Sequence, residues 1–251
     1  MISIKSEYEI NLMREAGMMV SKTHKYLKDF IKPGITTLEL DKLADDYIRS
    51  MGGIPTCKGY EGFPNALCTS VNDEVVHGIP SNRKLKNGDI ITIDMVIGYK
   101  GYQGDAAWTY AVGDISDNKK YLMEHTEKAL YKGIDEVKPG ARIGDISNAV
   151  FKYATSHKLG VVRELVGHGI GKEMHEDPDV PNYGKAGMGP KLREGMVICI
   201  EPMLNLGSAD IYVEDDDWTI KTMDGKPAAH YEHTVLVTND GYEILTPRLD
   251  D

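Results

Sequence analysis

The sequence contains few cysteines, and nothing in their spacing pairs them. Cys57, Cys68 and Cys199 lie far apart, form no Cys-x-x-Cys motif and leave one thiol over. Such a set indicates neither a disulfide framework nor a cysteine-rich zinc site. We therefore expect all three thiols to be small, buried side chains.

Long hydrophobic runs are also absent. No stretch reaches the roughly 18 apolar residues that a membrane-spanning helix needs. The first residues, MISIKSEYEINLMREAG, include acids where a secretion signal has its apolar core. We expect a cytoplasmic protein that has no membrane partner.

Positive charge is scarce as well. The 29 Lys and Arg residues are outnumbered by 39 Asp and Glu residues, which gives a formal net charge of −10. Affinity for nucleic acid or anionic lipid comes from clustered cations, so we expect no autonomous binding to either. Some of the acids can instead face a bound cation.

What the sequence does contain is an internal repeat. Residues 31–47 (IKPGITTLELDKLADDY) align without a gap with residues 137–153 (VKPGARIGDISNAVFKY), at an offset of 106. Residues 88–94 (GDIITID) and 195–201 (GMVICIE) match at an offset of 107. The first pair has helical apolar spacing after a turn, and the second pair consists of β-rich runs that end in a carboxylate. Two such matches in register predict two similar halves.

We interpret the 251 residues as one domain, 1–251, with α/β halves at about 1–122 and 123–251 that face each other across a pseudo-twofold axis. The apolar patterns predict helices and strands in both halves. The predicted helices cover 6–30, 36–51, 117–136 and 143–158. The predicted strands are a hairpin over 90–112 and single strands over 195–204 and 229–238, with a further hairpin turn at TNDGYEIL.

Four carboxylates lie inside otherwise apolar β-rich runs: Asp94, Asp105, Glu201 and Glu232. Burying an isolated carboxylate is unfavourable without a compensating charge, so the four need a common explanation. Two divalent cations would neutralise the four negative charges, with carboxylates bridging the ions, as in two-metal hydrolases. Oxygen-rich ligation suits Mn, Fe or Co and also accommodates Zn.

Most of the eight histidines are predicted to have ordinary roles. His24, His125 and His157 fall on polar faces of predicted helices, and we expect them at the surface. His230 and His233 flank Glu232, and we expect both to point away from the face of the strand that carries this carboxylate.

Three histidines lie in or beside glycine-containing loops, where proteins often present reactive groups. His77 belongs to VNDEVVHGIP, and His168 and His175 belong to GHGIGKEMHEDP. Their spacing is not the HExxH pattern that places two ligands on one helical face. The stretch alone is compatible with two metal ligands, with one ligand and one catalytic group, or with two solvated histidines.

Six segments, taken in order and with their spacing, resemble the bacterial type I methionine aminopeptidases. They are VNDEVVHGIP, ITIDMV, GYQGDAAWTY, VGHGIGKEMHEDP, EGMVICIEPM and YEHTVLVT, and the resemblance runs from about residue 3 to residue 249. It implies an α+β pita-bread fold, in which two pseudo-symmetric halves surround a curved antiparallel sheet. We expect neither the zinc-finger extension of eukaryotic type I enzymes nor the long insertion of type II enzymes.

The resemblance also implies a dinuclear metal centre. The ligands would be Asp94, Asp105, His168, Glu201 and Glu232, with Asp105 and Glu232 bridging two ions of Co, Mn, Fe or Zn. The implied reaction removes the N-terminal methionine from nascent polypeptides whose second residue is small, by attack of metal-activated water on the peptide carbonyl.

By the same resemblance, Glu201 would shuttle the proton. His175 would hydrogen-bond near the carbonyl oxygen and His77 near the scissile nitrogen, where charge develops in the transition state. A methionine side chain calls for an apolar pocket with soft groups. The resemblance lines this pocket with Cys57, Tyr60, Phe63, Cys68 and Trp218.

Four positions depart from the family pattern without removing a ligand. Ala106 and Val96 stand where hydroxyl residues are common, Met174 where an aromatic is frequent, and His230 where an amide is frequent. We expect Ala106 to remove a hydrogen bond near the metals. The four changes together bear on rate, metal preference and pocket shape.

Two alternative functions remain. A prolidase or an aminopeptidase P shares the fold but usually carries an extra N-terminal domain. A non-catalytic pita-bread binding protein typically lacks ligands, whereas all five are present here. For the aminopeptidase, the partners would be N-termini of nascent polypeptides, met at the ribosome, and we expect a monomer.

Overall fold

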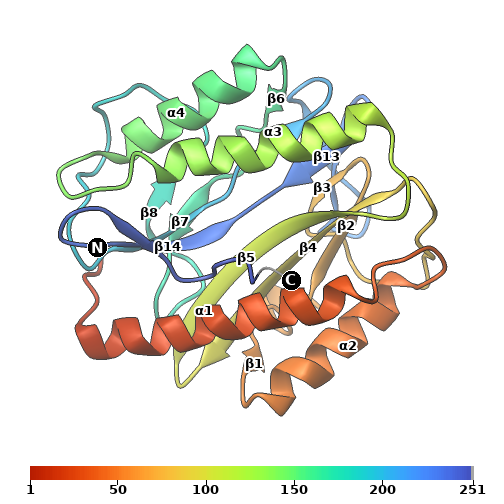
Figure 1. The fold of residues 1–251 in the computed structure, drawn as a ribbon, viewed down its shortest axis with the longest axis horizontal. Helices are drawn as coiled ribbons and strands as arrows, with labels where there is room; N and C mark the ends of the chain where they lie inside the picture. Colours follow the sequence, from red (N-terminus) through yellow and green to blue (C-terminus); the bar gives the residue numbers. More distant parts are fainter. Residues whose placement is uncertain (250–251) are drawn as a thin grey trace.

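The computed structural model describes residues 1–249, so the last two residues of the predicted domain 1–251 lie outside the described residues. Four helices flank a bent layer of strands: α1 (Glu7–Lys28), α2 (Thr37–Ser50), α3 (Asp117–Ile134) and α4 (Ile143–Ser156). Figure 1 shows α1 and α2 on one side of the strands and α3 and α4 on the other. Each helix begins and ends within two residues of its predicted range.

The strand pairs within residues 1–249 are all antiparallel, and with the four helices they confirm the α+β class. The predicted hairpin is β4 (Ile90–Tyr99) with β5 (Tyr102–Ala111). No helix of these residues combines the length and apolar character that a membrane crossing requires. The other strands are β1 (Ile54–Pro55), β2 (Cys68–Val71), β3 (Glu74–Val76), β6 (Gly160–Val161), β7 (Gly167–Gly169), β8 (Glu176–Val180), β9 (Val197–Ile200), β10 (Met203–Asn205), β11 (Ile211–Val213), β12 (Ile220–Thr222), β13 (Ala228–His230), β14 (His233–Val237) and β15 (Tyr242–Ile244).

Capping boxes fix where α1 and α2 begin. The backbone N–H of Ser6 donates to the Glu9 carboxylate at 2.7 Å, and the Glu9 N–H donates back to the Ser6 hydroxyl. Thr36 and Glu39 make the same exchange at the start of α2. This reciprocal pairing satisfies backbone donors that have no partner within the helix.

The sequence repeat is visible in the structure. α2 and α4 begin and end 106 residues apart, and α1 and α3 end 106 residues apart. A single antiparallel bridge precedes the second helix of each half: Thr36 pairs with Lys84 before α2, and Arg142 pairs with Lys191 before α4. The boundary expected between residues 122 and 123 falls inside α3. Because α3 repeats α1, we propose that the second half begins at α3.

Two predicted strands are each interrupted at a carboxylate. The strand expected over 195–204 is divided into β9 and β10 at Glu201, and the strand expected over 229–238 is divided into β13 and β14 at Glu232. β9 pairs with β14 and β10 pairs with β13, so the two interruptions lie opposite each other. Both carboxylates are therefore carried at one break in the regular ladder.

Side-chain hydroxyls join the two halves along β5. The Thr234 hydroxyl donates to the Asp105 carbonyl at 2.8 Å and accepts from the Asp105 N–H at 3.0 Å. The Thr109 hydroxyl makes the same two bonds to the backbone of His230, at 2.9 and 3.1 Å. Between them the Glu232 N–H donates directly to the Ala107 carbonyl at 2.7 Å. We call this contact, from Asp105–Thr109 to His230–Thr234, the seam.

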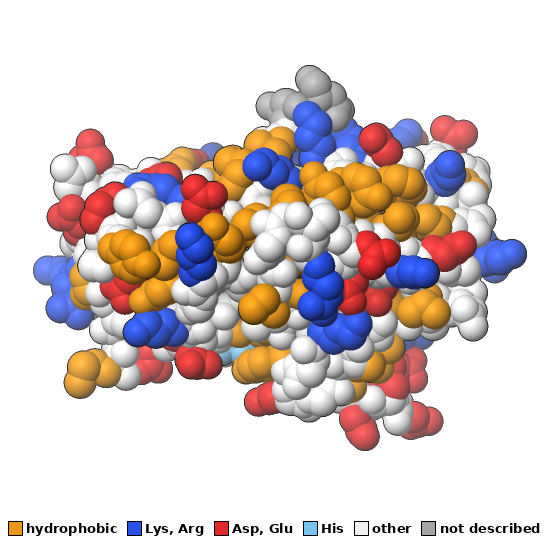
Figure 2. All heavy atoms as spheres, turned by 90° about the horizontal axis from the view of Figure 1, so that it is seen from below, with side chains coloured by type: hydrophobic (Ala, Val, Ile, Leu, Met, Phe, Trp, Pro, Cys, Tyr) orange, Lys and Arg blue, Asp and Glu red, His pale blue; other side chains and the backbone are white. Residues whose placement is uncertain are grey.

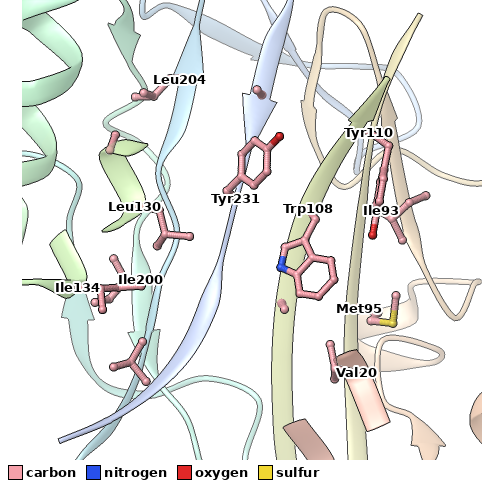
Figure 3. Packing of buried hydrophobic residues seen from close by; sticks show 14 of the residues in the cluster. Val20, Ile93, Met95, Trp108, Tyr110, Leu130, Ile134, Ile200, Leu204 and Tyr231 are labelled. Carbon is pink, nitrogen blue, oxygen red and sulfur yellow. The ribbon is translucent and has the colours of Figure 1, made fainter. Parts of the chain in front are cut away.

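The hydrophobic core continues across the seam. Figure 3 shows the rings of Tyr231 and Trp108 in the space between the two strands that form it. The Tyr231 hydroxyl donates to the Thr109 carbonyl at 3.0 Å, so even this buried aromatic bonds to the opposite half. Leu130 and Ile134 of α3 belong to the same core.

The outer face of the first helix pair carries mixed charge. Figure 2, which views the molecule from the side of α1 and α2, shows Lys and Arg side chains interspersed with Asp and Glu. Clustered cations, which nucleic-acid binding requires, do not dominate this face.

The seam leads to a test of stability. Thr234→Val leaves a buried N–H and a buried carbonyl of Asp105 without partners, so we expect the free energy of unfolding to fall by about 1–3 kcal/mol. Urea unfolding of the purified protein measures this. Thr155→Val, on the exposed side of α4, is the matched control. Equal effects of the two substitutions would show that the hydroxyl does not hold the seam.

Candidate metal centre and active site

The β4–β5 hairpin places two of the carboxylates on one face of its ladder. Asp94 pairs with Ala107, and Val96 pairs with Asp105. Side chains of paired residues lie on the same face, and Asp94 and Asp105 are diagonal neighbours there. The small Ala107 between them leaves room for both carboxylates to approach a shared ligand.

The glycines of GHG explain how His168 reaches this place. β7 lies between β9 and β8 in the sheet, closely packed on both sides. A Cβ at position 167 would lie 2.3 Å from the Cys199 carbonyl oxygen, and one at position 169 would lie 2.2 Å from the Asp177 carbonyl oxygen. Only glycine allows such close approach, so the motif seats His168 on a strand that is paired on both sides.

The imidazole of His168 meets the carboxylates of both halves. Its Nε2 lies 3.7 Å from Asp105 Oδ2 and 3.4 Å from Glu201 Oε1. Its Nδ1 donates to the Gly169 carbonyl at 2.9 Å, which leaves the lone pair on Nε2, toward the acids. Burial lowers the pKa of His168 to about 4, so the ring is neutral at pH 7.

The chemistry of the buried acids fits divalent cations. Asp105 and Glu232 are 4% and 2% exposed, and Asp105 Oδ1 and Glu232 Oε1 have no hydrogen-bond partner among residues 1–249. Burial, and then mutual repulsion with neighbouring carboxylates, raises the pKa of both well above the usual range. Burial first, followed by Asp94, also raises the pKa of Glu201. Unpaired buried carboxylates of this kind are compensated when they ligate a metal.

The donor atoms fall into two adjacent groups that share one residue. Asp105, His168, Cys199 and Glu232 offer atoms within 4.8 Å of one another, and so do Glu201, His230 and Glu232. Asp94 lines the same cavity. The structure thus brings the five residues Asp94, Asp105, His168, Glu201 and Glu232 around one space.

The expected orientation of His230 is wrong. His230 is 1% exposed, lines the cavity beside Glu232, and places Nε2 3.6 Å from Glu201 Oε2. Residues 230 and 232 are two positions apart, and alternation puts such residues on the same face. His233 does point away, because its Nδ1 pairs with the Thr246 hydroxyl at 3.1 Å. Each oxygen of the Glu201 carboxylate therefore faces an imidazole, His168 on one side and His230 on the other.

The expected surface position of His24 is also wrong. His24 is fully buried, stacks on Trp108 with ring centroids 4.0 Å apart, and pairs with the Ala106 carbonyl. Burial lowers its pKa to about 3, so it is a neutral core side chain behind the seam. His125 and His157 lie between α3 and α4, half-buried and stacked at 4.1 Å instead of fully exposed.

The predicted pocket residues line one cavity of about 230 Å³ next to the carboxylates. Phe63 and Trp218 meet edge to face, with centroids 5.1 Å apart. His77 and His175 line the same cavity. The backbone of His77 is left-handed, with φ at 58°. The predicted apolar residues that line the cavity are Cys57, Tyr60, Phe63, Cys68 and Trp218.

Four other residues of the cavity wall were not predicted from the sequence. Val76, Leu165, Val166 and Met203 also line the cavity. They are apolar residues in ordinary strand or loop segments, so only the tertiary fold identifies them. All three cysteines are buried, as expected.

Three of the four departures from the family pattern lie at two places, and the fourth, His230, lines the cavity as described above. Val96 and Met174 are buried in one hydrophobic cluster with Cys57 and Phe63, and Met174 also lines the cavity. Ala106 belongs to the main core, on the face of β5 opposite to Asp105. Its side chain therefore faces the core and not the carboxylates, and the lost hydrogen bond expected there has no place in this geometry.

The comparisons with known proteins identify the family. The model of metallopeptidase family M24 matches residues 11–239. The chain belongs to this family. It is 52% identical over 246 residues to methionine aminopeptidase 1 of Bacillus subtilis, covering 98% of this chain and 99% of that protein.

Solved structures of this metallopeptidase family place the fold. A crystal structure of methionine aminopeptidase from Rickettsia prowazekii matches with a TM-score of 0.97 at 43% identity, covering 98% of this chain and all of that one. An Xaa-Pro dipeptidase from Bacillus anthracis matches at 0.78 and 23% identity, with 63% of its chain covered, which shows the common fold alone. The pita-bread fold is confirmed.

The buried carboxylates lead to a prediction about the metal-free protein. Asp105→Asn removes one charge from the cluster, so we expect the EDTA-treated variant to be about 1–3 kcal/mol more stable than wild type at neutral pH. Because the pKa of Asp105 is raised in the folded state, the native protein binds more protons than the unfolded chain. The advantage of the variant should therefore shrink as the pH falls from about 7 to about 5.

Urea unfolding at both pH values, with and without Mn²⁺, measures this effect. Mn²⁺ should stabilise the wild type, since it binds only the folded state, and should stabilise Asp105→Asn much less. Asp240→Asn, at an exposed loop, controls for the loss of charge alone. A metal-free Asp105→Asn protein less stable than wild type would contradict the repulsion among the acids.

Proposed function

We propose that this chain removes the N-terminal methionine from polypeptides whose second residue is small. The observation that carries the proposal is the junction of a small apolar pocket with a cluster of buried carboxylates and imidazoles. A methionine side chain fills such a pocket, and the peptide bond that follows it then lies beside the carboxylates.

Two divalent cations, of Co, Mn, Fe or Zn, would be held by Asp94, Asp105, His168, Glu201 and Glu232. Asp105 and Glu232, the more buried acids, would lie between the ions. When bound, such cations supply Lewis acidity, which polarises a carbonyl oxygen and lowers the pKa of water. The neutral Nε2 of His168 is the one imidazole ligand in this proposal.

Three side chains then handle protons and hydrogen bonds. Glu201 lies at the edge of the cluster, with its side chain 12% exposed, where it can take a proton from the attacking water and return it to the leaving amine. His175, at the mouth of the cavity, donates to the carbonyl oxygen as charge develops there. His77 hydrogen-bonds near the scissile nitrogen.

The specificity follows from the confined space. The pocket wall of Cys57, Cys68 and Phe63 accepts an unbranched thioether. We place the second residue of the substrate beside His77 and Trp218, which line the cavity in edge-to-face contact with ring centroids 6.3 Å apart. A bulky second residue is excluded there, as in any site that selects by size.

The other candidates are less well supported. The likeness to a prolidase-type enzyme extends to the fold only, whereas relatives named methionine aminopeptidase match along the whole chain. A purely binding protein would not need the full donor set. We propose further that the chain acts as a monomer, in the cytoplasm, on N-termini of nascent polypeptides as they leave the ribosome.

Peptide cleavage tests the proposal. With Mn²⁺ or Co²⁺ present, we expect release of methionine from Met-Ala-Ser at least about 100-fold faster than from Met-Leu-Ser, because the site excludes bulk. Methionine release is followed by chromatography. Asp94→Asn should abolish both the cleavage and the binding of metal in titration calorimetry. Equal rates on the two peptides would indicate a broader peptidase, and full activity of Asp94→Asn would refute the site.

A further inference from the structure

We infer that Tyr60 sets the tautomer of His175 and so acts as a positioning residue for the reaction. This inference rests on the proposed function, in which His175 donates a hydrogen bond to the substrate carbonyl. It gives the Tyr60 hydroxyl a task separate from the place of its ring in the pocket wall.

The two side chains are in direct contact. The Tyr60 hydroxyl oxygen lies 2.8 Å from Nδ1 of His175, a normal hydrogen-bond distance. Their rings are arranged edge to face, with centroids 5.4 Å apart and planes at 65°. The contact joins residues 115 positions apart, one from each half of the molecule.

A compact loop delivers the hydroxyl to this place. The Gly59 N–H donates to the Phe63 carbonyl, and the Phe63 N–H donates to the Tyr60 carbonyl, both at 2.8 Å. Gly59 and Gly62 have φ angles of 91° and 93°, which favour glycine. The loop closes on itself through these bonds, which fix the backbone from which the Tyr60 side chain projects.

The loop that carries His175 is anchored independently. The Glu176 carboxylate accepts a bond from Lys5 Nζ at 2.6 Å, in a pair whose Lys5 side chain is only 5% exposed. The other Glu176 oxygen accepts the Lys172 N–H at 2.9 Å. A buried charged pair of this kind fixes the backbone next to His175. Other hydrogen bonds thus fix the backbone at both Tyr60 and His175, independently of the bond between their side chains.

The chemistry of the two groups decides which one donates. The phenol is a stronger acid than a neutral imidazole N–H, and the imidazole lone pair is a better acceptor than the phenol oxygen. Burial, and then the charges of Glu61 and Glu173, raise the pKa of Tyr60, so its proton is present at pH 7. The hydroxyl therefore donates to Nδ1.

The direction of this hydrogen bond determines which nitrogen of His175 carries the proton. With Nδ1 accepting, a neutral His175 carries its proton on Nε2. Nε2–H is then a donor at the nitrogen remote from Tyr60, on a ring that lies 4.3 Å from that of the proposed ligand His168. Without the hydroxyl, the Nδ1–H form also becomes populated, and this form offers a lone pair to the carbonyl oxygen where a donor is needed.

Nitrogen-15 spectroscopy of the full chain loaded with Zn²⁺ reads the tautomer directly. Histidine is labelled, and the spectrum of His175→Gln assigns the His175 signals by their loss. We expect the wild type to show His175 protonated at Nε2, and Tyr60→Phe to show a mixture of both forms. Tyr242→Phe, at an exposed tyrosine distant from the cavity, should leave the signals unchanged.

Kinetics on Met-Ala-Ser supply the second readout. Tyr60→Phe keeps the aromatic ring of the pocket, so we expect KM to stay within about twofold while kcat falls by about tenfold. In a His175→Gln background the same substitution should cause no further loss of kcat, because the two residues act through one bond. Circular dichroism confirms that each variant is folded.

Three results would overturn the inference. These are a wild-type His175 protonated at Nδ1, an unchanged tautomer in Tyr60→Phe, or a loss in Tyr60→Phe that adds fully to that of His175→Gln. A change in KM alone would assign the hydroxyl to the pocket wall and also count against the inference. If the wild type releases no methionine, the proposed function fails, and the spectra still decide the tautomer.

Discussion

The mutual repulsion of four buried carboxylates is the constraint on which the rest of this structure depends. In a medium of low polarity, like charges a few ångströms apart are strongly unfavourable, and among the described residues neither lysine nor arginine lines the cavity to offset them. The metal-free cluster must therefore be held together by interactions elsewhere. The seam supplies them: the hydroxyls of Thr109 and Thr234 fix the strands from which Asp105 and Glu232 project.

The pseudo-symmetry supplies a frame, and the differences between the halves supply the chemistry. α2 and α4 match residue for residue in their bounds, and the bridges that precede them match to within one residue. The first half carries its two acids on a continuous hairpin, whereas the second half carries its two acids at opposed breaks in the ladder. Acids from the hairpin and from the broken strands thus reach one cavity from different elements.

Much of this was predictable because it is local or periodic. The four helices follow from apolar spacing and from caps such as Thr36, and the repeat gave the pairing of the acids. The resemblance named pocket residues that the structure brings together. The breaks at Glu201 and Glu232 were not predictable, because a run such as VLVT continues the β pattern past the site where tertiary contacts divide it. His24 was misplaced for a related reason: its polar neighbours on α1 suggest solvent, yet Trp108 covers it.

His230 lies two positions from Glu232, so strand alternation places both side chains on the same face. If His230 pointed away from Glu232, the centre would contain a single imidazole. In the structure, its Nε2 lies 3.6 Å from Glu201 Oε2, so a second imidazole is present. The Glu201 carboxylate thus lies between His168 and His230, with one imidazole beside each of its oxygens. We infer a constraint on the tautomer of His175, because its hydrogen bond with Tyr60 decides which nitrogen of the His175 ring carries the proton. Tyr60 and His175 come from different halves, so their bond forms only when both halves fold together.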